Sequence, residues 1–152
     1  MITTLQAIEK IKRYCAYQER CQYDVRCKLR EWGIEKEKIE QIIDKLIAEG
    51  FINEARFATS FARGKFIINS WGFHRIVLEL KRRHISESCI NRAIEEIDNK
   101  LYLEKLNKLA FKWLEGHKQL AEYEKKQKVC RFLLAKGYEH EDIWSCINNI
   151  LK

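Results

Sequence analysis

The pattern of apolar positions along the 152-residue chain repeats three times. Each copy has a leucine near the end of one apolar stripe, an apolar residue five positions later, and then a stripe of isoleucines. The leucine of the first copy is Leu29, the second follows 51 residues later at Leu80, and the third 53 residues further at Leu133. Such a period is typical of a modular array, whose extended surface binds long partners. A role in binding is therefore favoured over chemistry in a pocket.

Three helices are predicted within the first copy. Thr3 or Thr4 can cap the first, a second over 23–32 ends at Gly33, and a third over 35–48 ends at Gly50. Gly33 fits the left-handed position that closes a helix. The expected buried residues recur at three- and four-residue spacing and are Leu5, Ile8, Ile11, Cys15, Val25, Leu29, Ile39, Ile42, Ile43, Leu46 and Ile47.

The second copy is predicted to open at Asn53, a helix cap, and Trp71-Gly72 separates its first two helices. Gly64 interrupts the first of these helices, and we ascribe it to packing. His84 takes the place of Gly33 in the turn before the last helix. The expected buried residues of the first helix in this copy are Phe57, Ala58, Phe61 and Ala62.

The third copy begins after Asp98-Asn99, and Gly116 closes its first helix. Leu106, Leu109, Ala110, Trp113 and Leu114 form the expected apolar face of that helix. The sequence therefore predicts an all-α protein, built of three tandem three-helix repeats over 1–50, 51–99 and 100–152 that form an elongated, curved array.

Composition supports a folded, helical chain. It is 46% apolar and 34% charged, with no proline and six glycines, and such a scarcity of helix breakers favours helix nearly throughout. No apolar run approaches the roughly 18 residues needed to span a bilayer, and the N-terminus lacks the apolar segment of a signal peptide. We expect a cytoplasmic protein with no membrane association.

Neither metal binding nor catalysis has a clear motif. The six cysteines include no C-x-x-C pair, and the four histidines form no ligand-spaced pair beside them. Packing as small hydrophobes is favoured for the cysteines, with a metal or redox role as the alternative. The chain has no glycine-rich phosphate loop and no nucleophile elbow. We therefore predict that it is not an enzyme and has no cofactor.

Charge is sorted by helix position within the copies. The net charge is +7. The predicted second helices carry +1, +3 and +4, whereas the third helices carry −1, −3 and −3. If the repeats stack in similar orientations, a basic stripe results that suits a polyanion, although a solvated surface is the alternative. The candidate nucleic-acid or filament-binding residues are Lys12, Arg13, Arg20, Arg26, Lys28, Arg30, Arg56, Arg63, Lys65, Arg75, Lys81, Arg82, Arg83, Lys112, Lys125, Lys126, Lys128 and Arg131.

The four tryptophans could stack on bases or pack between helices. Trp113 and Trp144 lie on or near apolar stripes, which favours the core. For Trp32 and Trp71, which lie at helix ends, both interpretations stay open. A helix-turn-helix reader is disfavoured, since its last helix would enter the major groove and the third helices here are acidic.

Four motifs, at matching spacings from about Tyr14 to Ile150, resemble the RecX family of bacterial regulators of the recombinase RecA. The family's glycine, two apolar residues, an acidic stretch and Arg-Phe-Ala are similar to Gly50–Ala58. The second element resembles Trp71–Leu80, ending in a basic turn and Ile85. The other matches are Lys28-Leu29 with Gly33-Ile34, and Arg131, Leu133, Gly137 and Tyr138.

The resemblance implies three tandem three-helix repeats that bind in the groove of the RecA–DNA filament. Such a protein inhibits strand exchange, ATP hydrolysis and coprotease activity, and so acts in recombination, DNA repair and the SOS response. We expect a monomer that binds the filament, and single- and double-stranded DNA weakly through charge. The acidic residues expected to face the protein partner are Glu87, Glu95, Glu96 and Asp98. The alternative is a general basic helical-repeat nucleic-acid binder with no recombinase partner.

Overall fold

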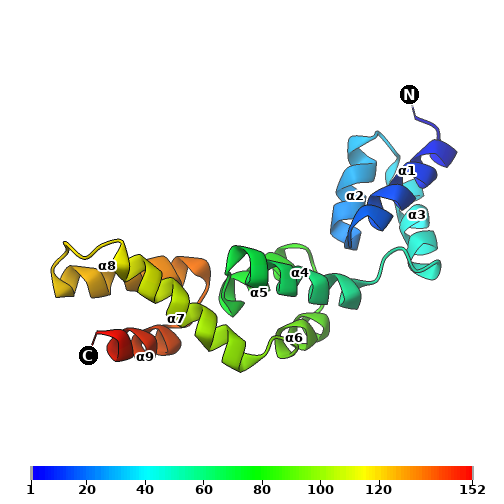
Figure 1. Cartoon of the computed structure of the whole chain (residues 1–152). Helices are drawn as coiled ribbons and strands as arrows, with labels where there is room; N and C mark the ends of the chain where they lie inside the picture. Colours follow the sequence, from blue (N-terminus) through cyan, green and yellow to red (C-terminus); the bar gives the residue numbers. More distant parts are fainter. Residues whose placement is uncertain (1, 152) are drawn as a thin grey trace. The chain divides into compact units, whose positions relative to one another are not determined.

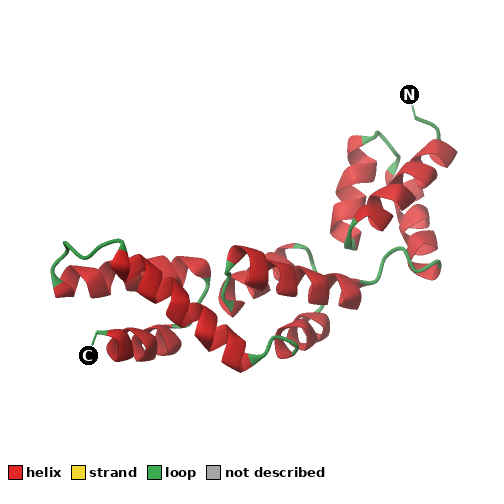
Figure 2. Cartoon of the chain, viewed as in Figure 1, coloured by secondary structure: helices red, strands yellow, loops and turns green. Residues whose placement is uncertain are grey.

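The computed structural model describes residues 2–151, and these form helices joined by short loops, with no strand among them (Figures 1 and 2). The prediction of an all-α fold is confirmed. In chain order the helices are α1 (Thr4–Tyr17), α2 (Gln22–Glu31), α3 (Lys36–Ala48), α4 (Glu54–Asn69), α5 (Phe73–Arg82), α6 (Glu87–Glu95), α7 (Asn99–Glu115), α8 (Glu122–Lys136) and α9 (His140–Ile150).

Side chains cap several of these helices at their N-termini. The Gln6 backbone N–H donates to Thr3 Oγ1 over 3.1 Å, and the Thr3 N–H donates to Gln6 Oε1 over 2.9 Å, which forms a capping box. Asn53 caps α4 by accepting from the Arg56 N–H over 3.0 Å, as its sequence position predicts. Asp98 caps α7 by accepting from the Lys100 N–H over 2.9 Å. Local sequence therefore determines where these helices begin.

The turn between the second and third helix has the same geometry in all three copies. A residue one or two positions after the helix is left-handed each time, with φ of 78° at Gly33, 58° at His84 and 104° at Gly137. The next residue donates its N–H back to the buried leucine of the preceding helix. These bonds run from Ile34 to Leu29 (3.1 Å), from Ile85 to Leu80 (3.2 Å) and from Tyr138 to Leu133 (3.2 Å). This is the Schellman motif, and it confirms the predicted turns.

Because the left-handed region is strained for any residue with a Cβ, the turn predicts opposite effects for two substitutions. Gly33→Ala is expected to lower the free energy of unfolding by about 1 kcal/mol, since its φ is positive. His84→Gly is expected to raise the free energy of unfolding by up to about 1 kcal/mol. Loss of the contact between the His84 and Tyr23 rings, whose centroids lie 5.8 Å apart, offsets part of this gain. Urea unfolding followed by circular dichroism measures both, and a shift in the same direction would contradict the argument.

The described residues divide into two compact units rather than three. The first comprises the chain up to Phe61 together with Leu80–Ala93, and the second comprises Ala62–Glu79 together with the chain from Ile94 onward. The middle repeat (α4, α5 and α6) therefore contributes residues to both units.

The first unit has an aliphatic core beneath α1, α2 and α3. Its members come from one face of each helix, and partly buried Ile8, Tyr14, Trp32 and Ile34 pack around them. Burial of this apolar surface is the main force that holds the three helices together. The buried residues of this core are Ala7, Ile11, Cys15, Val25, Leu29, Ile39, Ile42, Ile43, Leu46 and Ile52.

The second unit has an aromatic centre. The rings of Phe73 and Tyr102 stack with centroids 3.7 Å apart, and Tyr138 and Phe66 lie 5.2 and 5.8 Å from the Tyr102 ring. The Tyr102 hydroxyl accepts from the Phe73 N–H over 3.0 Å, and the Tyr138 hydroxyl donates to the Ser70 carbonyl over 3.0 Å. Helices α7, α8 and α9 pack against one another in this unit (Figure 1).

The start of α5 lies directly against the turn that follows α8. The Gly72 N–H donates to the Lys136 carbonyl over 2.8 Å, and the His74 N–H donates to the Gly137 carbonyl over 3.0 Å. A Cβ on Gly72 would lie 2.5 Å from both Gly137 O and the Tyr138 backbone nitrogen. The absence of a side chain at Gly72 is therefore a condition of this backbone contact.

Several positions differ from the sequence-based expectation. Gly64 does not interrupt α4, and a Cβ there would meet nothing within 4 Å, so the packing explanation is wrong. Leu5 is 77% exposed, since α1 buries the stripe of Ala7, Ile11 and Cys15 instead. The expected burial of Ile47 and Trp144 is also wrong, since they are 43% and 37% exposed. Each follows a buried residue, Leu46 or Ile143, and lies about 100° further around the helix, at the edge of the buried face.

Candidate nucleic-acid interface

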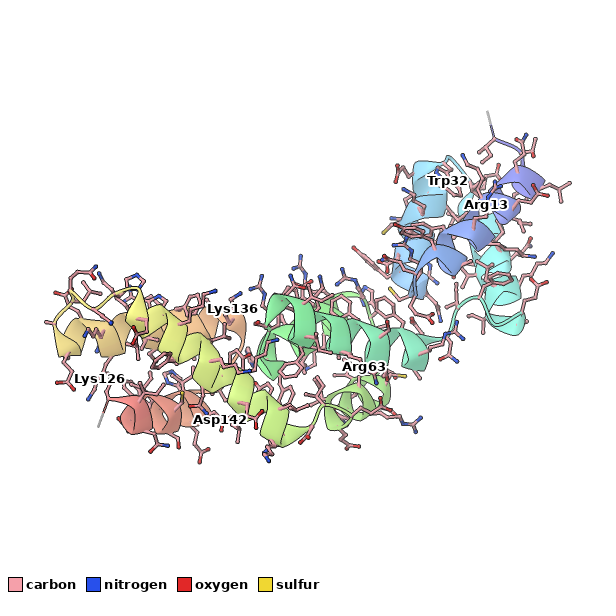
Figure 3. All side chains as sticks on the ribbon, viewed as in Figure 1. Arg13, Trp32, Arg63, Lys126, Lys136 and Asp142 are labelled. Carbon is pink, nitrogen blue, oxygen red and sulfur yellow. The ribbon has the colours of Figure 1, made fainter. Side chains whose placement is uncertain are left out.

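The predicted basic residues lie in both compact units, so each unit presents its own set. In the first unit they lie on α1, α2 and α4, at Arg20 in the loop between α1 and α2, and in the segment 81–83, and in the second on α4, α5, α7 and α8. Figure 3 shows four labelled cations, Arg13 on α1, Arg63 on α4, and Lys126 and Lys136 on α8.

Within residues 2–151, at least seven of the predicted cations form ion pairs with acidic side chains, which lowers the charge they offer a phosphate. Most of those in the first unit join residues distant in sequence, so the sequence pattern did not reveal them. The pairs of the first unit are Lys12–Glu49 (3.4 Å), Arg26–Glu40 (2.8 Å), Lys28–Glu31 (3.7 Å), Arg56–Glu19 (2.5 Å) and Arg83–Asp24 (3.7 Å). Those of the second are Arg63–Glu96 (3.8 Å) and Lys128–Glu124 (3.9 Å).

The Arg26–Glu40 pair is the best aligned of these. Arg26 Nε and Nη2 donate to the two Glu40 carboxylate oxygens over 2.8 and 2.9 Å, a bidentate geometry. This hydrogen bonding raises the pKa of Arg26 and lowers that of Glu40. Arg26 is therefore committed to the fold, and it is a weaker phosphate ligand than its sequence position indicates.

Other predicted cations form no ion pair within residues 2–151 and remain the stronger candidates. In the first unit these are Arg13, Arg20, Arg30 and Lys81, and in the second they are Arg75, Lys112, Lys125, Lys126 and Arg131.

Each unit holds an aromatic ring that contacts two cations. In the first, the Arg20 guanidinium lies 3.7 Å and the Lys28 ammonium 5.6 Å from the Tyr14 ring centroid. Arg20 Nε also donates to the Tyr14 carbonyl over 3.1 Å. Burial raises the pKa of Tyr14, an effect that Arg20 partly opposes. The ring fixes the position of two cations at the protein surface.

In the second unit the ring is Trp71. The Arg75 guanidinium lies 4.3 Å and the Lys65 ammonium 5.0 Å from its centroid. Lys136 donates to the carbonyl of Asn69, the last residue of α4, over 3.2 Å, which adds a third cation. We call Lys65, Trp71, Arg75 and Lys136 the Trp71 cluster. Sequence reasoning missed Lys136, although it occupies the position equivalent to Arg83 in the repeat.

The structure places the four tryptophans in different surroundings. Trp71 and Trp32 lie under cations, the latter with the Lys10 ammonium 5.0 Å from its centroid. Trp113 stacks on His117, with centroids 3.8 Å apart. Trp144 is exposed on α9, whose first turn carries Glu141 and Asp142 (Figure 3 labels Asp142). Carboxylates beside Trp144 repel phosphates, so Trp71 is the better placed for a nucleic acid.

The predicted acidic residues are also divided between the units. Glu87 belongs to the first, whereas Glu95, Glu96 and Asp98 belong to the second. Glu96 pairs with Arg63 and Asp98 caps α7, so both have structural roles. Glu95 is exposed at the end of α6 and forms no ion pair within residues 2–151, and it is the best placed of the three to face a partner.

The cysteines do not gather into a site. Cys15, Cys21, Cys130 and Cys146 are buried, Cys89 is half-buried and Cys27 is exposed. Burial raises the pKa of Cys15 to about 11, of Cys21 to about 12 and of Cys146 to about 11, which keeps these thiols protonated and unreactive. Over residues 2–151 no group of three or more histidine, cysteine or acidic side chains is arranged to hold a metal ion. Nor does any helix there combine the length and apolarity needed to cross a membrane.

The fold and these surfaces define a class, an all-helical tandem array of three-helix domains with cations held on aromatic rings. Family models describe three such domains in this chain, the first, second and third three-helix domains of RecX, which match residues 7–46, 53–94 and 101–147. The chain belongs to the RecX family. The resemblance read from the sequence motifs is confirmed.

Relatives in the family are similar over most of this chain. Regulatory protein RecX of Clostridium tetani (strain Massachusetts / E88) is 33% identical over 135 residues, covering 88% of this chain and 60% of the relative. That of Clostridium perfringens (strain 13 / Type A) is 30% identical over 135 residues, covering 85% and 59%. The chain thus spans about three fifths of the length of these curated relatives. The crystal structure of RecX from Lactobacillus salivarius superimposes with a TM-score of 0.82 at 28% identity, covering 96% of this chain and 95% of that one.

Proposed function

We propose that this chain regulates the recombinase RecA by binding to the RecA–DNA filament and limiting strand exchange, ATP hydrolysis and coprotease activity. The observation that carries the proposal is membership of a family whose curated relatives are named regulatory protein RecX. The ring-held cations of both units support it, because they give two surfaces with affinity for phosphate. The three domains occupy residues 1–50, 51–99 and 100–152 in this proposal, and the chain acts as a monomer.

The deciding experiment compares binding to RecA–ATP–single-stranded DNA filaments with binding to the same DNA alone. Fluorescence anisotropy at about 150 mM salt screens weak electrostatic association. Much tighter binding to the filament is the expected result. Equal affinity for filament and bare DNA would refute a recombinase partner and favour a general nucleic-acid binder.

The Trp71 cluster predicts a change in the salt dependence of DNA binding. Arg75→Gln removes one phosphate-neutralising charge while keeping a long side chain, so the slope of log K against log salt is expected to fall by about one unit. Arg56→Gln is the matched control, because Arg56 is paired with Glu19 and its loss leaves the slope unchanged. Equal slopes for Arg75→Gln and the unaltered chain would place Arg75 away from DNA.

The acidic surface predicts a loss of filament affinity on charge reversal. Glu95→Lys is expected to weaken filament binding by about 1 kcal/mol, roughly fivefold in Kd, since an exposed ion pair contributes this much at most. Glu9→Lys on α1, which also exchanges an exposed carboxylate for an ammonium, serves as the control. If both variants bind the filament as tightly as the unaltered chain, Glu95 does not face the recombinase.

A further inference from the structure

The second unit has a cavity of about 310 Å³ between the end of α4 and one face of α7. Six of its lining residues lie on α7, at positions three or four residues apart along the helix, so they form one continuous face. All of the lining belongs to the second unit, and none of it takes part in the Trp71 cluster. The lining residues are Phe66, Ser70, Leu101, Glu104, Lys105, Lys108, Leu109 and Lys112.

The floor of this cavity is apolar and rigid. Phe66 is only 6% exposed and its ring stacks on Tyr102, which fixes its position. Leu109 is half-buried, whereas Leu101 is 54% exposed at the edge. Covering this exposed aliphatic surface with a partner's apolar side chain is favourable, because the apolar surface is removed from water.

The rim is positively charged. Lys105 is held in place, since it donates to the Ile67 carbonyl over 2.8 Å and lies 5.5 Å from the Phe66 ring centroid. Lys108 and Lys112 are exposed, one helical turn apart, and neither has an acidic partner within residues 2–151. Glu104 contributes the one negative charge of the lining, which leaves the cavity with a positive surplus.

We propose that this cavity is a docking site for an acidic amphipathic helix of a protein partner. An apolar side chain of that helix enters between Leu101, Leu109 and Phe66, and carboxylates one turn apart pair with Lys108 and Lys112. Two helices laid side by side present side chains at matching three- and four-residue intervals, which suits this row of lysines.

The chemistry of the floor favours a protein over a nucleic acid. Leu101 and Leu109 offer no ring on which a base could stack, and Phe66 is already covered by Tyr102. The polar edges of a base would find few partners on an aliphatic floor, which is costly. The proposal goes beyond regulation of a recombinase, because it requires neither DNA nor RecA.

The test uses fluorescein-labelled helical peptides of about 16 residues, roughly four turns. The acidic probe carries leucine at every third or fourth position, flanked by glutamate. One control peptide replaces the leucines by serine, and another replaces the glutamates by lysine. Anisotropy with the full chain is expected to give a Kd in the micromolar range for the acidic probe alone.

Variants locate the binding site. The pair Lys108→Glu and Lys112→Glu is expected to weaken binding of the acidic probe more than tenfold, and Leu101→Glu to weaken it similarly. The pair Lys36→Glu and Lys38→Glu on α3 makes the same change of charge on exposed residues of the first unit and is expected to leave the affinity unchanged. Thermal unfolding confirms that each variant is folded.

Four outcomes would overturn the proposal. The acidic probe could fail to bind at millimolar concentration, or the serine peptide could bind as tightly, which would reduce the effect to charge. The Lys36 and Lys38 pair could lose as much affinity as the Lys108 and Lys112 pair. Finally, a thymidine oligonucleotide could bind more tightly and depend on Lys108 and Lys112, which would make the cavity a nucleic-acid site. All of these outcomes are measured without RecA, whereas the regulatory proposal is tested with the filament, so the failure of one proposal is distinguishable from the failure of the other.

Discussion

Replacement of Gly72 by alanine is expected to lower the free energy of unfolding by about 3 kcal/mol. The new methyl group would lie 2.5 Å from Gly137 O and from the Tyr138 backbone nitrogen. Backbone atoms cannot move aside as a flexible side chain can, so the start of α5 must separate from the turn after α8. That separation also weakens the hydrogen bonds from the Gly72 and His74 N–H groups, each of which contributes about 1 kcal/mol.

Gly64→Ala is the matched control for this substitution. It makes the same chemical change in the same repeat, but nothing lies within 4 Å of the added methyl group. Because alanine favours a helix over glycine, Gly64→Ala is expected to raise the free energy of unfolding by about 0.5–1 kcal/mol. Urea unfolding of the two variants measures the difference, and a stabilised Gly72→Ala variant would disprove the close contact.

Removal of the Tyr102 ring is expected to destabilise the second unit by about 4 kcal/mol. Tyr102 is 1% exposed, and its ring contacts those of Phe66, Phe73 and Tyr138. Tyr102→Ala leaves a cavity that these rigid rings cannot fill. It also leaves the Phe73 N–H without its acceptor.

Tyr102→Phe separates these two contributions. It keeps the ring and removes only the hydroxyl, so it is expected to cost about 1 kcal/mol. Burial raises the pKa of Tyr102 to about 12, so the hydroxyl stays protonated at neutral pH and the cost does not vary there. Denaturant unfolding at pH 7 measures both variants. Equal losses for phenylalanine and alanine would show that the hydroxyl, rather than the stacking of rings, stabilises this centre.

Features of the fold that depend on local sequence could be predicted. Gly33 was predicted to be left-handed, since it follows the end of a helix and precedes an apolar residue, and His84 was placed in the equivalent turn of the second copy. The buried stripes of α2 and α3 followed from spacing alone, apart from Ile47. Asn53 was recognised as a helix cap for the same reason.

Features that depend on distant residues could not be predicted. The contact between Gly72 and Gly137 joins positions far apart in the chain, and nothing beside Gly72 in the sequence indicates it. The Arg56–Glu19 and Arg63–Glu96 pairs likewise became evident only from the structure. The charge of each helix located the basic segments but did not separate paired cations from unpaired ones. The ion pairs seen in the structure removed more residues from the set of candidate phosphate ligands than any other feature.

The glycine at the start of α5 also fixes the order of the modules. The position equivalent to Gly72 in the first repeat is Cys21, whose side chain is completely buried within its own unit. In the third repeat it is Lys125. A chain with its first and second modules exchanged would bring a sulfur atom against the backbone of Gly137, where there is no space for a methyl group. Although the three modules share one plan, they are not interchangeable, and recombining them would require new residues at each junction.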